Sequence, residues 1–331
     1  MSIVTRAHAR AGLLGNPSDG YFGKIIAISV KNFTARAFIR ESEEIRIEPA
    51  RGDVPVYANA RDLIEKISLY GYYGGTRLIQ AAARLFFDYC SKNAVRLADK
   101  NFAIGYDSDI PRQVGLGGSS AIIVAAMRGL MRFYEVEIPL EILPTLVLQA
   151  ELGELGINAG FMDRVTQVFE GCVYMDLDKR LIEGRGYGEY ERLDAGRLPP
   201  LYLAYKPQLG KVSGHLLNEI RVAYDRGDPE VIETLRKIAG TAGRGREDFE
   251  RGDFRRWPAL MNESFDLRSR IMKISDANLA LVRTARACGA SANYAGSGGS
   301  IVGIYDGEAM FESLATGLGS LGAVVLKPQV V

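Results

Sequence analysis

The chain has 331 residues, of which 47% are hydrophobic and 24% are charged. This composition is that of an ordinary folded protein, and the length allows two lobes or one large α/β domain. The 41 basic and 40 acidic residues nearly cancel, so the basic excess that holds nucleic acid is missing.

The first half of the chain alternates between predicted strands and predicted helices. Residues 2–10 and 24–48 are rich in β-branched and apolar side chains, which is typical of strands and hairpins. Residues 76–90 carry apolar side chains at helical spacing, which predicts an amphipathic helix. Two more strands are expected at 102–106 and 172–176, and three helices between them, directly after residue 121, at 139–154 and at 162–169.

The second half is predicted to be mostly helical. The tract 183–200 is rich in glycine and proline, which predicts a loop and the best candidate boundary between lobes of residues 1–190 and 191–331. Beyond it we expect helices at 212–225, 229–239, 253–273, 276–288 and 308–318, and strands at 201–205, 301–305 and 322–326.

Cysteine and histidine usage limits the chemistry. Cys90, Cys172 and Cys288 form no CxxC pair, so we expect buried, reduced thiols rather than disulfides or a zinc site. With only His8 and His215, a Ser/His/Asp triad is poorly supported and proton chemistry falls to carboxylates, lysines or arginines. No apolar run suits a signal peptide or a membrane span, so we expect a soluble, cytoplasmic protein.

A glycine-rich segment between a predicted strand and an apolar helix is the strongest chemical signal. Its notable residues are Pro111, Gly115, Leu116, Gly117, Gly118, Ser119, Ser120 and Ala121. Converging backbone N–H groups and the helix dipole make such a helix start a phosphate site. Neither the Walker lysine pattern nor the dinucleotide GxGxxG spacing is present, and a flexible loop with a serine N-cap is the alternative.

Phosphoryl transfer also needs a carboxylate for the acceptor hydroxyl and one for Mg²⁺. Glu151 near the end of one predicted helix and Asp163 at the start of the next are candidates. Taken alone, either residue is better explained as a solvated surface acid.

Three ordered segments resemble the GHMP kinases, the superfamily named for galactokinase, homoserine kinase, mevalonate kinase and phosphomevalonate kinase. Residues 111–121 look like its central motif, residues 10–19 like its N-terminal motif, and residues 295–300 like its C-terminal glycine-rich motif. Within the superfamily, the runs 71–75, 110–113 and 160–168 look most like plant-type glucuronokinases.

The resemblance implies an α+β fold with two lobes. The N-terminal lobe would be related to a ribosomal-protein domain, and the C-terminal lobe would be a ferredoxin-like antiparallel sheet with helices. ATP and Mg²⁺ would lie in the cleft, with the glycine-rich segment around the phosphates. By the same resemblance, Asp163 is the acceptor's base or orienting carboxylate, Arg10 stabilises the transferring phosphoryl group, and Glu151 holds Mg²⁺ with Ser119 or Ser120.

Substrate contacts are also implied by the resemblance. They are expected from Gly15, Asp19, Arg164, Gly296 and Gly298. The chain departs from the sugar-kinase pattern because Asn16 and Pro17 stand where a glutamate and a histidine are common. A uronic acid would need a cation for its carboxylate; the unranked candidates are Lys24, Arg77, Arg112 and Arg164. The tyrosines that could wall a ligand or fill core are Tyr70, Tyr72 and Tyr73.

The expected reaction is ATP-dependent phosphorylation of the anomeric hydroxyl of D-glucuronate or a related free sugar. A kinase for galactose, another hexose or mevalonate is the nearest alternative, and a non-catalytic sensor of sugar and ATP is the alternative from another class. We expect a small-molecule partner, neither nucleic acid nor membrane, and leave the oligomeric state open.

Overall fold

The computed structural model describes residues 2–50, 74–207 and 213–331. Its first sheet is built on two long strands, β1 (Ile3–Leu14) and β2 (Lys24–Ser42), which pair antiparallel. On its other edge β2 pairs with β4 (Asn101–Ser108) near its end and with β5 (Cys172–Asp176) near its start. The parallel β3 (Arg46–Ile47) and the antiparallel β6 (Glu189–Leu193) complete six strands.

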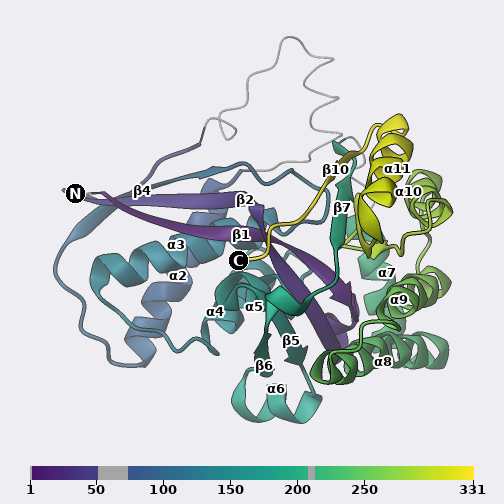
Figure 1. Cartoon of the computed structure of the whole chain (residues 1–331). Coiled ribbons are helices and arrows are strands. Elements are labelled where there is room, and N and C mark those ends of the chain that lie inside the picture. Colours follow the sequence, from purple (N-terminus) through teal and green to yellow (C-terminus); the bar gives the residue numbers. More distant parts are fainter. Residues whose placement is uncertain (1, 51–73, 208–212) are drawn as a thin grey trace, which may run out of the picture.

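Helix α3 (Gly118–Tyr134) is the centre of this half of the molecule. Twelve of its 17 residues are buried, which suits a helix that packs on β1 and β2 with one face and on α2 (Thr76–Lys92) with another. Figure 1 shows α2 and α3 together beside the long strands. Further helices here are α4 (Leu143–Gln149), α5 (Phe161–Phe169) and α6 (Lys179–Arg185).

The second sheet is antiparallel and lies on the opposite side of Figure 1 from α2 and α3. Its strand order is β10 (Val324–Leu326), β7 (Leu201–Tyr205), β9 (Ser300–Ile304), β8 (Asn293–Tyr294). The helices of this half are α7 (Ser213–Asp225), α8 (Pro229–Arg251), α9 (Trp257–Ile271), α10 (Asp276–Ala287) and α11 (Gly307–Ser320).

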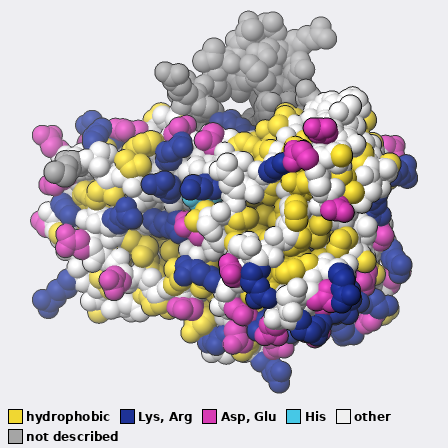
Figure 2. All heavy atoms as spheres, viewed as in Figure 1, with side chains coloured by type: hydrophobic (Ala, Val, Ile, Leu, Met, Phe, Trp, Pro, Cys, Tyr) yellow, Lys and Arg dark blue, Asp and Glu magenta, His cyan; other side chains and the backbone are white. Residues whose placement is uncertain are grey.

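The two halves are joined at the end of β1. The backbone N–H of Gly12 donates to the carbonyl of Ala295 at 2.7 Å, and the Asn293 side chain donates to the carbonyl of Leu13 at 3.0 Å. On the face shown in Figure 2, basic and acidic side chains are interspersed, as the nearly cancelling charges predict.

The predicted order of strands and helices is confirmed, with three corrections. The tract 183–200 is not a loop, because it includes β6, which continues the sheet beside β5. The proposed lobe boundary at residue 190 falls inside that strand, and the residue ranges of the two lobes stay a prediction. Residues 139–154 are not one helix: after α4, residues Ala150–Glu154 form a π-helical turn.

The third correction concerns α8, which runs twelve residues beyond the predicted end at 239 because its buried face continues through Ala242, Gly245 and Phe249. A side chain at Gly245 would lie 2.3 Å from Leu14, so this glycine allows close packing rather than ending the helix. Among the thiols, Cys90 and Cys172 are buried and free as expected, whereas Cys288 is free but partly exposed.

The buried Asp248 carboxylate on α8 provides a stability prediction. It accepts hydrogen bonds from Arg251 at 2.7 Å and from Arg256 at 3.1 Å. Although burial works in the other direction, these contacts hold the pKa of Asp248 below its ordinary value. Stability from a lowered pKa is present above the unfolded-state pKa, near 4, and is lost as the pH falls through the folded-state pKa.

We therefore expect Asp248→Asn to lower the free energy of unfolding by about 1 to 2 kcal/mol at pH 7 and by much less at pH 3. Urea unfolding at both pH values measures this difference. The exposed pair of Asp253 and Arg255 offers a control, since Asp253→Asn should have little effect. An equal loss at pH 7 and pH 3 would contradict an ionic origin.

Candidate active site

A cavity of about 450 Å³ lies where the glycine-rich loop before α3 faces the loop after β8 and the turn after β1. The predicted site residues that line it are Arg10, Asp19, Pro111, Gly115, Leu116, Gly117, Gly118, Ser119, Ser120, Glu151, Asp163, Arg164 and Gly296. These residues come from segments far apart in the chain, so the fold brings together most of what the sequence predicted.

The glycine-rich loop has the backbone of an anion site. Gly115 and Gly117 have φ angles of 70° and 76°, and α3 begins directly after them. Gly117 is the N-cap residue and no side chain caps the first turn, so the alternative of a serine N-cap is wrong. A Cβ at Gly117 would lie 2.8 Å from the Gln167 amide nitrogen and 3.2 Å from Asp163 Oδ2, so only glycine fits here.

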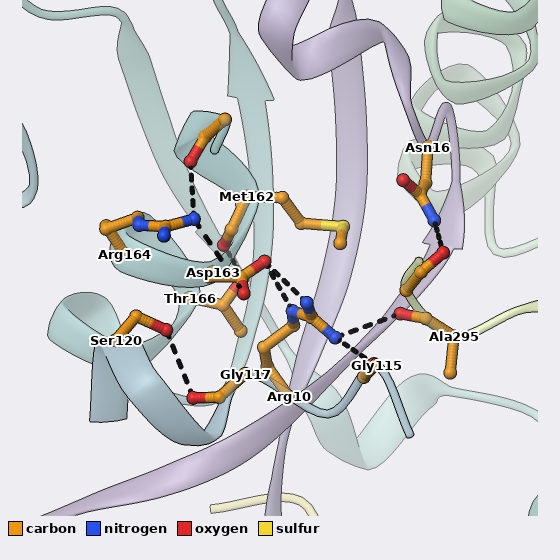
Figure 3. Close-up of polar contacts among 12 residues, drawn as sticks. Arg10, Asn16, Gly115, Gly117, Ser120, Met162, Asp163, Arg164, Thr166 and Ala295 are labelled. Carbon is orange, nitrogen blue, oxygen red and sulfur yellow. Dashed lines mark hydrogen bonds and ion pairs between the residues drawn. The ribbon is translucent and has the colours of Figure 1, made fainter. Parts of the chain in front are cut away.

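Arg10 connects this loop to the rest of the site (Figure 3). Its Nε and Nη2 both lie 2.6 Å from Asp163 Oδ1, and its Nη1 donates to the carbonyl of Gly115 at 2.5 Å and of Ala295 at 3.3 Å. The residue is only 4% exposed, so Arg10 is not a surface cation. One guanidinium therefore fixes α5, the phosphate loop and the C-terminal glycine loop relative to each other.

Asp163 lies in the first turn of α5 and keeps its negative charge at neutral pH. Burial alone would raise the pKa of this carboxyl, but the charges of Arg10 and Arg164 and the hydrogen bond from Arg10 outweigh it, and the pKa is below its ordinary value. A carboxylate of this kind is a weak base, well suited to orient a hydroxyl group and accept its proton as the oxygen reacts.

Glu151 is buried in the π-helical turn and forms an ion pair with Arg164, a contact that the sequence did not predict. Arg164 also donates to the carbonyl of Gly160 at 2.8 Å, so two partners hold its guanidinium. Burial raises the pKa of Glu151, an effect that the charge of Arg164 opposes. π-Helical turns are common at functional sites because they place one side chain out of helical register.

Asp19, after β1, reaches the start of α5. Its Oδ2 accepts a hydrogen bond from the backbone N–H of Met162 at 3.0 Å, so it does cap a helix, and burial raises its pKa. It also lines the cavity, which leaves the predicted sugar contact open as a second role.

Three predicted ligand contacts, Gly15, Ala121 and Gly298, are not among the lining residues. Gly15 has a φ of 87°, and a Cβ there would lie 2.0 Å from the carbonyl oxygen of Lys24, so it is required for the turn after β1. Ala121 is fully buried within α3.

Sequence reasoning missed several lining residues, chiefly Asn16, Tyr21, Arg221 and Arg268. Asn16 donates to the carbonyl of Gly296 at 2.9 Å, and so ties the turn after β1 to the C-terminal glycine loop. Arg268 is 0% exposed on the buried face of α9. Arg268 stands at helical spacing from the buried residues of α9, and this pattern could have been recognised in the sequence.

The four cations that could bind a substrate carboxylate differ in whether they line the cavity. Arg112 and Arg164 line the cavity, whereas Lys24 and Arg77 do not, and Lys24 forms an ion pair with Asp176 at 2.8 Å. The candidates Tyr70, Tyr72 and Tyr73, with most of the run 71–75, lie outside the described residues.

The described part of the chain has no group of three or more His, Cys, Asp or Glu side chains placed to hold a metal ion. None of its helices combines the length and the apolar character needed to cross a membrane.

Comparison with known proteins agrees with this geometry. Residues 77–171 match the family model for the GHMP kinases N terminal domain. The chain is 41% identical over 304 residues to "Probable glucuronokinase 2" of Arabidopsis thaliana, covering 90% of this chain and 82% of that protein. It is 38% identical over 307 residues to "Glucuronokinase 1" of the same plant, covering 91% and 84%.

Solved structures show the same fold. Lactococcus lactis galactokinase complexed with galactose superposes with a TM-score of 0.77 at 16% identity, covering 99% of this chain and 93% of that one. The chain belongs to the GHMP kinases, and it is an ATP-dependent kinase that transfers phosphate to a hydroxyl group. The predicted superfamily, the two-lobe α+β fold and the enzyme class are thus confirmed.

Proposed function

We propose that this kinase phosphorylates the anomeric hydroxyl of D-glucuronate and releases the sugar 1-phosphate and ADP. The observation that carries the proposal is the buried pair of Arg10 and Asp163 against the phosphate loop, in a chain whose relatives are named glucuronokinases. The pair sets a carboxylate and a cation beside each other, which is what a hydroxyl acceptor and a phosphoryl donor require.

The loop and the start of α3 suit the phosphates of ATP. The first-turn N–H groups have no side-chain cap, Gly117 allows close approach of a ligand, and the helix dipole favours negative charge. Holding the donor needs no residue to move a proton, so this part of the site works by positioning and electrostatics.

Glu151 and Ser119 or Ser120 are the residues that we propose for Mg²⁺. They line the same cavity as the phosphate loop. Mg²⁺ at such sites is held by one or two carboxylates together with the donor's phosphates, so a single buried glutamate is enough. Ser120 donates its hydroxyl to the carbonyl of Gly117 at 3.1 Å, which leaves Ser119 the freer of the two hydroxyls to turn toward a metal. The ion would neutralise charge on the phosphates.

At the acceptor, Asp163 orients the C1 hydroxyl and takes its proton. The acceptor oxygen forms a bond to the γ-phosphorus, and the bond from that phosphorus to the bridging oxygen of ADP breaks. Arg10 faces the charge that develops on the phosphoryl group. The free thiols support the cytoplasm as the compartment for this reaction.

The test is a panel of acceptors in a coupled ADP-release assay, with the phosphorylated position assigned by phosphorus NMR. We expect D-glucuronate to be turned over most efficiently, with phosphate only on C1. Preferential turnover of galactose or mevalonate would assign another substrate within the family. Binding of ATP and sugar without any phosphorylated product would favour a sensor instead.

A further inference from the structure

Among the residues that the structure describes, the nearest carboxylate to Arg221 is 3.9 Å away and none forms an ion pair with Arg268. We propose that these two arginines of the cavity recognise the carboxylate of a uronic acid acceptor. Arg221 on α7 would make the direct contact, and Arg268 on α9 would support it from the wall behind. The inference rests on the proposed function. It attributes the kinase's preference for an acidic over a neutral sugar to these two side chains.

Two other arginines that line the cavity already have carboxylate partners. Arg10 is paired with Asp163, and Arg164 is paired with Glu151. Their positive charge is therefore largely neutralised by the protein itself. A negatively charged substituent on the acceptor needs a cation that the protein has not already paired.

Arg221 has this property. Its Nη2 donates to the backbone carbonyl of Gly20 at 2.7 Å, and its guanidinium lies 4.4 Å from the centre of the Tyr21 ring. Both partners are neutral, so they orient the group without cancelling its charge. Within the described residues its carboxylate contact is Asp225, four residues later and 3.9 Å away. The side chain is 34% exposed and lines the cavity, so a ligand can reach it.

Arg268 supplies a second positive charge, which is fully buried. Its Nη1 donates to the carbonyl of Gly296 at 2.8 Å, and its guanidinium lies 4.9 Å from the centre of the Tyr294 ring. Its Nη2 has no hydrogen-bond acceptor among the described residues, although the side chain is 0% exposed and lines the cavity. Burial lowers its pKa only to about 10, so it remains charged at neutral pH.

A buried cation without a counter-charge is costly for a folded protein. Such a cost is common where a site is prepared for a ligand of opposite charge. Because Arg268 is sealed from water, its charge is weakly screened and acts strongly on an anion that enters the cavity.

The positions of Arg221 and Arg268 also fit an acceptor whose C1 hydroxyl lies at Asp163. Both lie beside the turn after β1: Arg221 contacts Gly20, and Asn16 and Arg268 both donate to the carbonyl of Gly296. The same turn carries Asp19, which reaches to Met162 next to Asp163. In a hexuronate, the carboxylate is carried by C5 and the reacting hydroxyl by C1, the two carbons that flank the ring oxygen, so the two groups are close neighbours on one side of the ring. With C1 at Asp163, the carboxylate can point toward this turn.

The test compares D-glucuronate with D-glucuronamide, which has the same shape without the charge, at saturating ATP. For the wild type we expect a clear preference for the acid. Arg221→Gln should lower kcat/KM for glucuronate by about 30-fold and change the value for the amide by less than about 3-fold, since one charge-assisted contact is lost. The KM for ATP should not change, and Arg221→Lys should restore part of the preference.

Arg226→Gln is the matched control, because Arg226 is exposed just after the end of α7 and does not line the cavity. It should leave both values unchanged. Arg268→Gln, with its melting temperature measured alongside, should also reduce the ratio of acid to amide.

These measurements distinguish failure of the carboxylate subsite from failure of the proposed function. If the wild type phosphorylates glucuronate but Arg221→Gln keeps the wild-type ratio of acid to amide, the carboxylate subsite is wrong and the proposed function stands. If the wild type uses neutral sugars and ignores glucuronate, the proposed function fails and the subsite fails with it.

Discussion

Replacement of Asp163 with asparagine is expected to lower kcat by about 10³-fold while leaving the affinity for ATP nearly unchanged. The amide keeps the size of the side chain and can still accept a hydrogen bond from Arg10, so the loop and α5 should remain in place. What is lost is the negative charge and the ability to take the acceptor's proton. Steady-state kinetics, together with calorimetric titration of the variant with ATP, measures the two effects separately.

The lowered pKa of Asp163 also predicts how activity depends on pH. Because the charges of Arg10 and Arg164 keep it below the ordinary value, the wild-type carboxylate is ionised throughout the neutral range. Asp163 should therefore cause no loss of activity between pH 8 and pH 6. Asp276→Asn, an exposed change at the start of α10, is the matched control and should be silent. An unchanged kcat for Asp163→Asn would remove this residue from the mechanism.

The sequence predicted the position of the glycine-rich loop and of the helix after it well, because the signal is local. Three glycines directly before an apolar helix determine both the backbone conformation and the position of the helix start. The resemblance to known kinases then supplied Arg10, Glu151 and Asp163 by order along the chain. Their presence in one cavity follows from the pairing of β1 with β2 and the packing of α3 and α5 against these strands.

The sequence did not show how the charged residues pair. That Arg10 binds Asp163 while Arg164 binds Glu151 depends on side-chain positions set by tertiary packing. Arg221 and Arg268 were missed for a related reason: they reach the cavity from helices of the second half, far from any motif. For α8, helix propensity failed because three glycines after residue 239 predict a helix end, whereas close packing requires one of them.

Arg10 variants should show the second large effect, because one guanidinium has several partners. Arg10→Met removes the cation that we propose for the phosphoryl group and leaves Asp163 without its nearest counter-charge. We expect kcat to fall by about 10³-fold or more, since guanidinium groups that stabilise phosphoryl transfer contribute this much. Losing one partner of a buried pair should also lower the free energy of unfolding, by about 3 kcal/mol. Kinetics and urea unfolding measure these two losses.

Arg10→Lys separates charge from geometry. A lysine keeps the positive charge but cannot bind Asp163 with two nitrogens and also reach the carbonyls of Gly115 and Ala295. Its kcat should therefore lie between those of the wild type and Arg10→Met. Arg6→Met, on the exposed face of the same strand, is the control and should change neither activity nor stability appreciably.

The double variant Arg10→Met/Asp163→Asn tests whether the two residues act as one unit. With the charge at 163 already removed, loss of the cation leaves no unpaired carboxylate, so the double variant should be more stable than Arg10→Met alone. Its kcat should lie close to that of the poorer single variant rather than at the product of the two losses. Additive losses in both stability and kcat would mean that the residues act independently, and that their contact is not what organises the site.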